Sequence, residues 1–230
     1  MKGLRAIVFG ATGGIGEAIS KELHQRGAEI YLIGRSAEKI NHLKKHLKIK
    51  SSQTYCINSI TNESGYQETQ DWLVSQKGTF QIGIHCAGKA IIKKASQITT
   101  AEWQSIIDIN LNSAFSFFKL FDSVRDTRQF ELIYLGSAGT DQIWPKNSLY
   151  GASKAGLEMF AKTLQKEVKN QGGRVWLYKP GSVFTGFFNN IKNHLPPEKM
   201  IQPADLAKVI VDNLGTDPKL FYPEISLLSE

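Results

Sequence analysis

The sequence predicts an α/β protein: a doubly wound, parallel β-sheet of about seven strands, flanked by helices, in a single domain that spans residues 1–230. Short β-rich segments alternate with longer segments of helical period, which is the pattern of βαβ units. A cluster of glycines separates the first strand from the first helix. With 230 residues, 41% of them hydrophobic, the chain can bury one sizeable core but is short for two domains.

Seven short β-rich segments are predicted as strands: residues 4–9, 29–33, 54–57, 80–85, 131–135, 175–178 and 220–222. Six segments of helical period are predicted as helices: residues 14–26, 37–47, 63–76, 101–125, 148–171 and 204–213. The helix at 148–171 has the clearest apolar face, followed by two glycines: Leu157, Phe160, Ala161, Leu164 and Val168. Residues 184–202 contain two adjacent prolines and are too long for an idle connection, which predicts a substrate loop.

The net charge of +7 comes mostly from residues 21–50, which carry eight Lys or Arg and three acidic residues. A solvated helix face is the ordinary explanation for such a cluster. A nucleic-acid partner is not expected, because no stripe of basic and aromatic residues accompanies the charge. A membrane partner is not expected either, because no apolar run approaches the roughly 20 residues that cross a bilayer.

Cysteine and histidine usage argues against disulfides and metals. Cys56 and Cys86 form no C-x-x-C pair, so free thiols in a reducing compartment, the cytoplasm, are expected. His42 and His46 lie one helical turn apart, but two lysines separate them and no third ligand is evident. The apolar run at residues 6–9 is far shorter than that of a signal peptide, so export is not indicated.

The first strand leads into a helix through the run Gly10-Ala11-Thr12-Gly13-Gly14-Ile15-Gly16. Glycines in such a turn let backbone N–H groups approach a pyrophosphate at the positive end of the helix. The glycine spacing differs from the G-x-G-x-x-G fingerprint and is unspecific by itself. A glycine-rich turn that serves only the fold is the alternative.

The end of the second predicted strand reads Gly34-Arg35-Ser36. An NAD-binding domain usually carries an acid here, which accepts hydrogen bonds from the adenosine ribose hydroxyls. An arginine suits a 2′-phosphate instead, because its planar fork forms charge-assisted pairs with phosphate oxygens. Arg35 and the positive charge around it therefore indicate NADP(H), with a plain surface arginine as the alternative.

A phenol and an ammonium share one helix face in Tyr150-Gly151-Ala152-Ser153-Lys154. The adjacent ammonium is expected to lower the pKa of the phenol, so that the pair can exchange a proton with a carbonyl oxygen. The spacing alone is unspecific. However, Ser137 ends the fifth predicted strand, at the carboxyl edge where open α/β sheets bind ligands. Asn110 is a polar residue inside an apolar helical stretch and needs a partner.

Together these motifs resemble the short-chain dehydrogenase/reductase family, and the resemblance covers nearly the whole chain. It implies a Rossmann-like fold, NADP(H) as the coenzyme, and a catalytic tetrad of Asn110, Ser137, Tyr150 and Lys154. It also implies the coenzyme contacts Gly10, Thr12, Gly13, Gly14, Ile15, Gly16, Arg35, Asn58, Ala87, Gly88, Tyr150, Lys154, Pro180, Gly181, Val183 and Thr185.

Three departures from the family pattern stand out. His85-Cys86 replaces two asparagines that stabilise the sheet in the family, and Asn58 stands where an aspartate usually meets the adenine. The glycine-rich C-terminal strand of longer relatives is replaced by residues 221–225. In longer relatives that strand region builds the tetramer interface, so this departure argues against the same interface here. A homodimer or homotetramer is expected, with a dimer formed through the helices that end near Arg125 and Gln171.

The resemblance implies an NADPH-dependent carbonyl reductase or alcohol dehydrogenase. Its substrate would be a ketone or an aldehyde, and a 3-oxoacyl carrier-protein reductase is one version. Trp144, Phe187 and Phe188 are expected to line an apolar substrate pocket. The alternative function is a catalytically idle NADP(H)-binding sensor or scaffold on the same fold, although such a protein has no use for a paired Tyr150 and Lys154.

Overall fold

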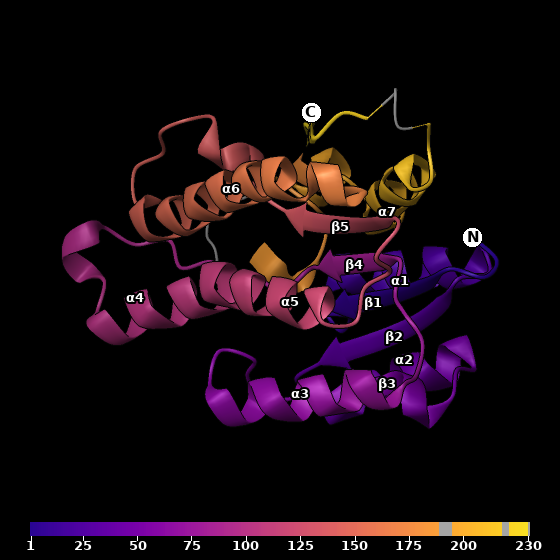
Figure 1. Cartoon of the computed structure of the whole chain (residues 1–230). Coiled ribbons are helices and arrows are strands. Elements are labelled where there is room, and N and C mark those ends of the chain that lie inside the picture. The colour runs from indigo at the N-terminus through magenta and orange to yellow at the C-terminus, as the bar shows by residue number, and fades with distance from the viewer. Residues whose placement is uncertain (189–194, 218–220, 230) are drawn as a thin grey trace.

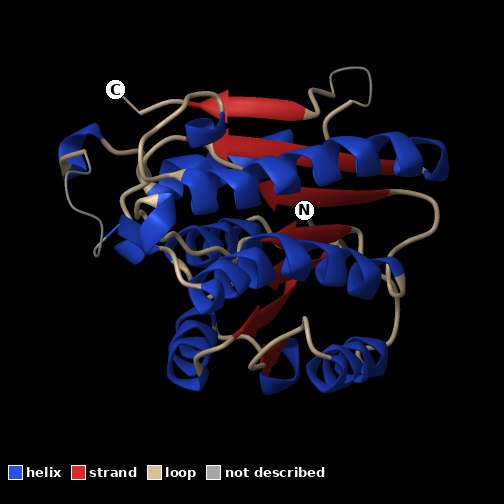
Figure 2. Ribbon diagram, turned by 90° about the vertical axis from the view of Figure 1, so that its left-hand side faces the viewer, coloured by secondary structure: helices blue, strands red, loops and turns tan. Residues whose placement is uncertain are grey.

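The computed structural model describes residues 1–188, 195–217 and 221–229. Seven parallel strands form one sheet in the order β3-β2-β1-β4-β5-β6-β7. Helices cover both faces of the sheet (Figures 1 and 2). The predicted fold class, a Rossmann-like doubly wound sheet, is therefore confirmed. Within the described ranges, no helix combines the length and the apolar character that crossing a bilayer requires.

The strands are β1 (Arg5–Phe9), β2 (Glu29–Gly34), β3 (Thr54–Cys56), β4 (Ile82–His85), β5 (Phe130–Leu135), β6 (Gly173–Pro180) and β7 (Glu224–Leu227). The longer helices are α1 (Gly14–Gln25), α2 (Ala37–Leu47), α3 (Glu63–Ser75), α4 (Thr100–Ile107), α5 (Ser113–Asp122), α6 (Ser148–Val168) and α7 (Pro203–Asn213). The predicted helix 148–171 ends in a 3₁₀ turn, Lys169–Gln171.

The two faces of the sheet are covered by different helices. Alternate residues of β1 point to opposite faces, Ala6 and Val8 toward α1, α2 and α7, and Ile7 and Phe9 toward α3, α5 and α6. Because β1 pairs with both β2 and β4, the order of the strands reverses there. A crevice for ligands is expected outside the carboxyl ends of the strands at this point.

The predicted helix 101–125 is interrupted in the structure. A π-helical turn, Asp108–Asn112, separates α4 from α5, and α5 ends at Asp122. Such turns are rare and occur often at functional sites. Asn110 lies in this turn and is fully buried, so the irregularity coincides with one of the predicted site residues.

The last strand lies later in the chain than the prediction of residues 220–222. Residue 220 lies outside the described part of the chain, and β7 begins at Glu224. Pro223 has no N–H group to donate to a neighbouring strand. Its carbonyl accepts a hydrogen bond of 2.8 Å from the Leu177 amide, and the regular pairing with β6 starts directly after it.

His85, at the end of β4, is buried in an aromatic part of the core. Its Nε2 lies 2.8 Å from the Ser113 hydroxyl, and its ring stacks on Phe9 with centroids 5.3 Å apart. Burial, together with the positive charge of Lys154, lowers the pKa of His85 to about 3. His85 is therefore a neutral core residue at physiological pH.

The buried imidazole makes the fold sensitive to acid. Because the pKa of His85 is depressed in the folded chain, the unfolded chain binds the extra proton first, and stability is lost as the pH falls from about 6.5 toward 3 at up to ~1.4 kcal/mol per pH unit. In His85→Asn, we expect a smaller loss of unfolding free energy between pH 6.5 and pH 4, measured by urea denaturation. Equal losses in both proteins would contradict the assignment.

Candidate active site

The glycine turn after β1 is packed tightly against the segment after β4. Gly10 has a φ of +80°, and a Cβ on it would lie 2.7 Å from the Ala87 nitrogen. Gly13 is the N-cap residue of α1 and has no side chain that could cap the helix. It therefore leaves the first amides of the helix, those of Gly14, Ile15 and Gly16, uncovered. Backbone amides at the positive end of a helix are suited to bind a phosphate group.

The segment after β6 closes on the same turn. A Cβ on Gly14 would lie 2.5 Å from Thr185 Cγ2, so only glycine leaves room for this approach. Pro180 ends β6, and the Gly181 amide donates to the Leu227 carbonyl at 2.7 Å. Two groups of predicted coenzyme contacts, residues 10–16 and residues 180–185, are thus brought together.

Val183 fixes the start of the predicted substrate loop. It forms an isolated parallel bridge with Ile201, and the Phe184 amide donates to the Ile201 carbonyl at 2.9 Å. The two ends of the segment 184–202 are therefore held side by side. Residues 189–194 of this loop lie outside the described part of the chain.

Arg35 lies at the carboxyl end of β2, directly before Ser36, the N-cap of α2. Its side chain is exposed, and within residues 1–188, 195–217 and 221–229 it has no ion-pair partner. The preceding Gly34 is crowded, because a Cβ on it would lie 2.9 Å from Thr12 Cγ2. An acid at this position would require the Thr12 side chain to move. Asn58 is exposed and lies two residues beyond the end of β3, the strand next to β2.

Lys154 is the central side chain of the tetrad. It is 4% exposed, and its Nζ donates to the Leu135 carbonyl at 2.7 Å. Ser137 follows Leu135 by two residues, and Tyr150 lies one turn before Lys154 on α6. A Cβ on Gly88 would lie 3.6 Å from the Lys154 Nζ, so the segment after β4 also reaches this point.

The Asn110 amide joins three segments of the chain. Its Oδ1 accepts from the Lys89 amide at 2.8 Å, and its Nδ2 donates to the Lys89 carbonyl at 2.9 Å and to the Ser153 hydroxyl at 2.8 Å. Ser153 in turn donates to the Tyr150 carbonyl at 2.8 Å. The side chain of Asn110 therefore holds the π-helical turn, the segment after β4 and α6 together around the tetrad.

Burial changes the ionisation of the tetrad in two directions. It raises the pKa of Tyr150, an effect that the Ser137 hydroxyl opposes and the Glu158 carboxylate increases. It lowers the pKa of Lys154 to about 8, against the influence of Cys86 and Glu158. The expectation that Lys154 lowers the pKa of Tyr150 is not met, because desolvation of the phenolate dominates. Tyr150 keeps its proton at neutral pH.

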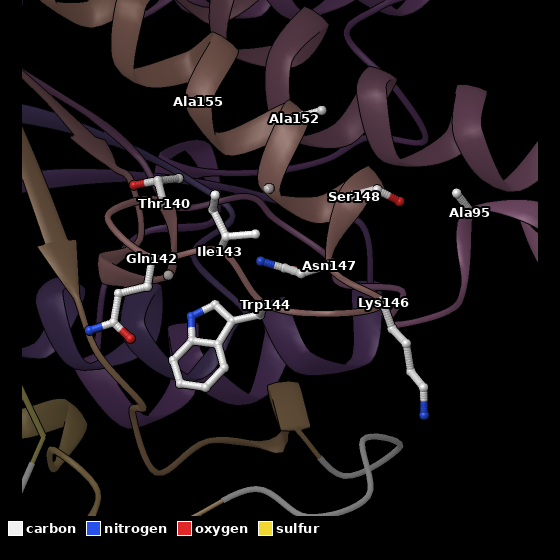
Figure 3. A pocket seen from close by; sticks show the side chains of 12 residues that line it. Ala95, Thr140, Gln142, Ile143, Trp144, Lys146, Asn147, Ser148, Ala152 and Ala155 are labelled. Carbon is white, nitrogen blue, oxygen red and sulfur yellow. The ribbon is translucent and has the colours of Figure 1, made fainter.

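Two of the three predicted substrate residues are described with their side chains. Trp144 lines a hollow of about 430 Å³ between the turn after β5 and α6, and Figure 3 shows its indole below Ala152 and Ala155 of that helix. Phe187 lies edge-on to the Tyr150 ring, with centroids 6.1 Å apart. The side chain of Phe188 lies outside the described part of the structure. Contact of these residues with a substrate stays a prediction.

Two charged residues near the site were not singled out by the sequence patterns. Glu158 lies one turn after Lys154 on the buried side of α6, and Lys179 lies inside the buried strand β6 just before Pro180. The sequence does carry a signal for Lys179, because this lysine directly follows four apolar or aromatic residues of the strand, residues 175–178. A charge in such a position requires partners.

The sequence matches a known protein family over most of its length. A family model described as short chain dehydrogenase matches residues 5–196. The chain belongs to the short-chain dehydrogenase family. An uncharacterized oxidoreductase of Staphylococcus aureus (strain USA300) is 28% identical over 215 residues, which cover 93% of this chain and 91% of that protein. This short-chain dehydrogenase is thus an oxidoreductase of a family that binds nicotinamide coenzymes.

Solved structures agree with the fold. The closed form of serine dehydrogenase complexed with NADP⁺ has a TM-score of 0.84 at 20% identity, covering 97% of this chain and 94% of that one. An alcohol dehydrogenase from the archaeon Thermococcus sibiricus, complexed with 5-hydroxy-NADP, has a TM-score of 0.85 at 21% identity, covering 97% and 95%. At these identities the likeness extends to the fold of this short-chain dehydrogenase.

Proposed function

We propose that the protein is an NADPH-dependent carbonyl reductase that acts on a ketone or an aldehyde. The observation that carries this proposal is the convergence of Ser137, Tyr150 and Lys154 at the carboxyl edge of the sheet, beside the uncapped start of α1. Bound NADPH would supply the hydride to the carbonyl carbon.

Tyr150 would donate the proton to the carbonyl oxygen. Its raised pKa keeps the phenol protonated at neutral pH, which is the form that reduction requires. The Ser137 hydroxyl, next to the phenol, would orient the carbonyl oxygen. The edge-on ring of Phe187 would exclude water from the apolar side of Tyr150.

Lys154 and Asn110 would act around this proton donor. Lys154 would bind the nicotinamide ribose while it stays attached to the Leu135 carbonyl. Asn110 would anchor a water that links Lys154 to solvent, and it holds α6 in place through Ser153. Through Lys154 and this water, Tyr150 would regain a proton from solvent after each reduction.

The coenzyme assignment rests on the end of β2. Arg35 is exposed and free to bind a 2′-phosphate, and Lys39 lies on the first turn of α2 beside it. Gly34 is not the acid that would bind ribose hydroxyls and repel a phosphate, and an acid there would press against Thr12. Asn58 would hydrogen-bond the adenine. Two free thiols, Cys56 and Cys86, fit a reducing compartment, and we place the protein in the cytoplasm.

Subunit association is the remaining part of the proposal. Phe115 on α5 is 55% exposed and Met159 on α6 is 66% exposed. The ring of Phe115 contacts Phe160 of α6, with centroids 6.4 Å apart, so the two helices present one apolar surface. Figure 1 shows α5 and α6 side by side. We propose that this surface forms a homodimer.

Tyr150→Phe tests the proton donor. The change removes the hydroxyl and keeps the ring, so we expect turnover with a panel of ketones and aldehydes to fall by ~10²–10⁴-fold. NADPH binding, measured by calorimetry, should stay nearly unchanged. Near-normal turnover by the variant would remove Tyr150 from the mechanism. Absence of NADPH oxidation by the unmodified protein with every carbonyl would favour an idle sensor.

Arg35→Ala tests the coenzyme. Loss of a charge-assisted hydrogen bond of ~1.5–3 kcal/mol should weaken NADPH binding by roughly 10- to 150-fold and leave NADH binding little changed. The control is Lys48→Ala, which removes a charge of the same basic region beyond the end of α2 and should leave the ratio of the two affinities unchanged. A preference of the unmodified protein for NADH would overturn the assignment.

Phe115→Glu tests the dimer. A carboxylate in the middle of a buried apolar surface is costly, so the mass measured by light scattering should fall from that of two chains to that of one. Val74→Glu is the control for an added surface charge, because Val74 is a similarly exposed apolar residue that lies on α3 and not on α5 or α6. A single-chain mass for the unmodified protein would contradict the dimer.

A further inference from the structure

Lys179 is a buried cation that contacts three carboxylates from three parts of the chain. The residue is 2% exposed and directly precedes Pro180. Its Nζ contacts Asp141 in the turn after β5, lies 3.2 Å from a Glu158 carboxylate oxygen on α6, and lies 3.5 Å from one of Glu224 on β7. A buried ammonium needs such partners, and removal of one of them leaves an uncompensated charge.

Glu158 and Lys179 hold the turn that carries Ser137. The Thr140 hydroxyl contacts Glu158 Oε1 at 2.5 Å and the Ser137 carbonyl at 2.7 Å, while Lys179 binds the next residue, Asp141. On the other side of the serine, a Cβ on Gly136 would lie 3.3 Å from the same Glu158 oxygen. The backbone before Ser137 therefore passes close to Glu158, and the backbone after it is held by Thr140, which Glu158 contacts.

Glu158 also lies beneath the proton donor. It follows Lys154 by one turn and Tyr150 by about two turns on α6, on the side of the helix that faces the sheet. Its negative charge raises the pKa of Tyr150 and of Lys154. The charged groups that face it are Lys179 of β6, Lys154 of α6 and Asp141 of the turn, with Glu224 and its partner Lys162 on the far side of Lys179.

We propose that Glu158, held in place by Lys179, is a positioning residue for the reduction. It fixes the turn of Ser137 through Thr140 and places a negative charge beneath Tyr150 and Lys154. This inference rests on the proposed function, since it assigns a role within the same site. A purely structural ion pair would contribute to stability alone and would leave the chemistry unchanged.

Thr140→Val tests the geometric half of the proposal. Valine keeps the shape but removes the hydroxyl that joins Glu158 to the serine turn, so we expect kcat to fall by about 10- to 100-fold while the affinity for NADPH is kept. Thr140→Ser restores a hydroxyl and should restore most of kcat. If Thr140→Val keeps the kcat of the unmodified protein, Glu158 does not position Ser137.

Glu158→Gln tests the electrostatic half. Because the carboxylate raises the pKa of Tyr150, its removal should move the alkaline limb of the kcat profile for reduction to lower pH. Lys162→Gln is the matched control, since Lys162 lies one turn further along α6 and, in the described part of the chain, pairs with Glu224 and not with Glu158. It should leave the profile in place. A loss of thermal stability in Glu158→Gln, with kcat and its profile unchanged, would make the residue structural.

A titration separates failure of this inference from failure of the proposed function. NMR of protein labelled with ¹³Cζ-tyrosine, assigned through Tyr150→Phe, measures the pKa of Tyr150 without turnover. The pKa should be lower in Glu158→Gln and unchanged in Lys162→Gln. An unchanged value in Glu158→Gln overturns the electrostatic role even if the protein reduces carbonyls. If the protein reduces none, the proposed function falls and this titration alone decides whether Glu158 controls Tyr150.

Discussion

The hydrogen bond from the Lys154 ammonium to the Leu135 carbonyl sets the relative position of the two halves of the site. It joins α6, which carries Tyr150, to the end of β5, from which the chain continues to Ser137. Because the ammonium is almost fully buried, water does not replace this carbonyl, and the charge-assisted bond is costly to break. The phenol and the serine are therefore placed by a contact that neither of them makes.

Desolvation is the largest influence on the ionisation of Tyr150 and Lys154. It keeps the phenol of Tyr150 neutral and brings the pKa of Lys154 to about 8, close to the pH at which cells work. The negative charge of Glu158 raises both pKa values. It therefore favours the charged form of Lys154 and the neutral form of Tyr150. Tyr150 thus keeps its proton at neutral pH and has the Lys154 ammonium one helical turn away.

Local pattern and motif spacing predicted most of the fold and the edge of the sheet where the tetrad meets, because periodicity and βαβ connections are local properties. The rest depends on contacts between distant residues. The π-helical turn coincides with the partners of Asn110, which lie 21 and 43 residues away. β7 starts directly after Pro223 and lies at the edge of the sheet, where its residues are exposed or half-buried, so no apolar run marks its start. The direction in which the pKa of Tyr150 shifts depends on its burial, which the spacing of a motif does not predict.

The close approach of Gly34 to Thr12 couples two positions of the proposed coenzyme site. A side chain at residue 34 would begin 2.9 Å from Thr12 Cγ2, so an aspartate there requires the threonine side chain to shift. The effect of an exchange at position 34 therefore depends on the residue at position 12. A library designed to change the coenzyme of this protein should vary the two positions together.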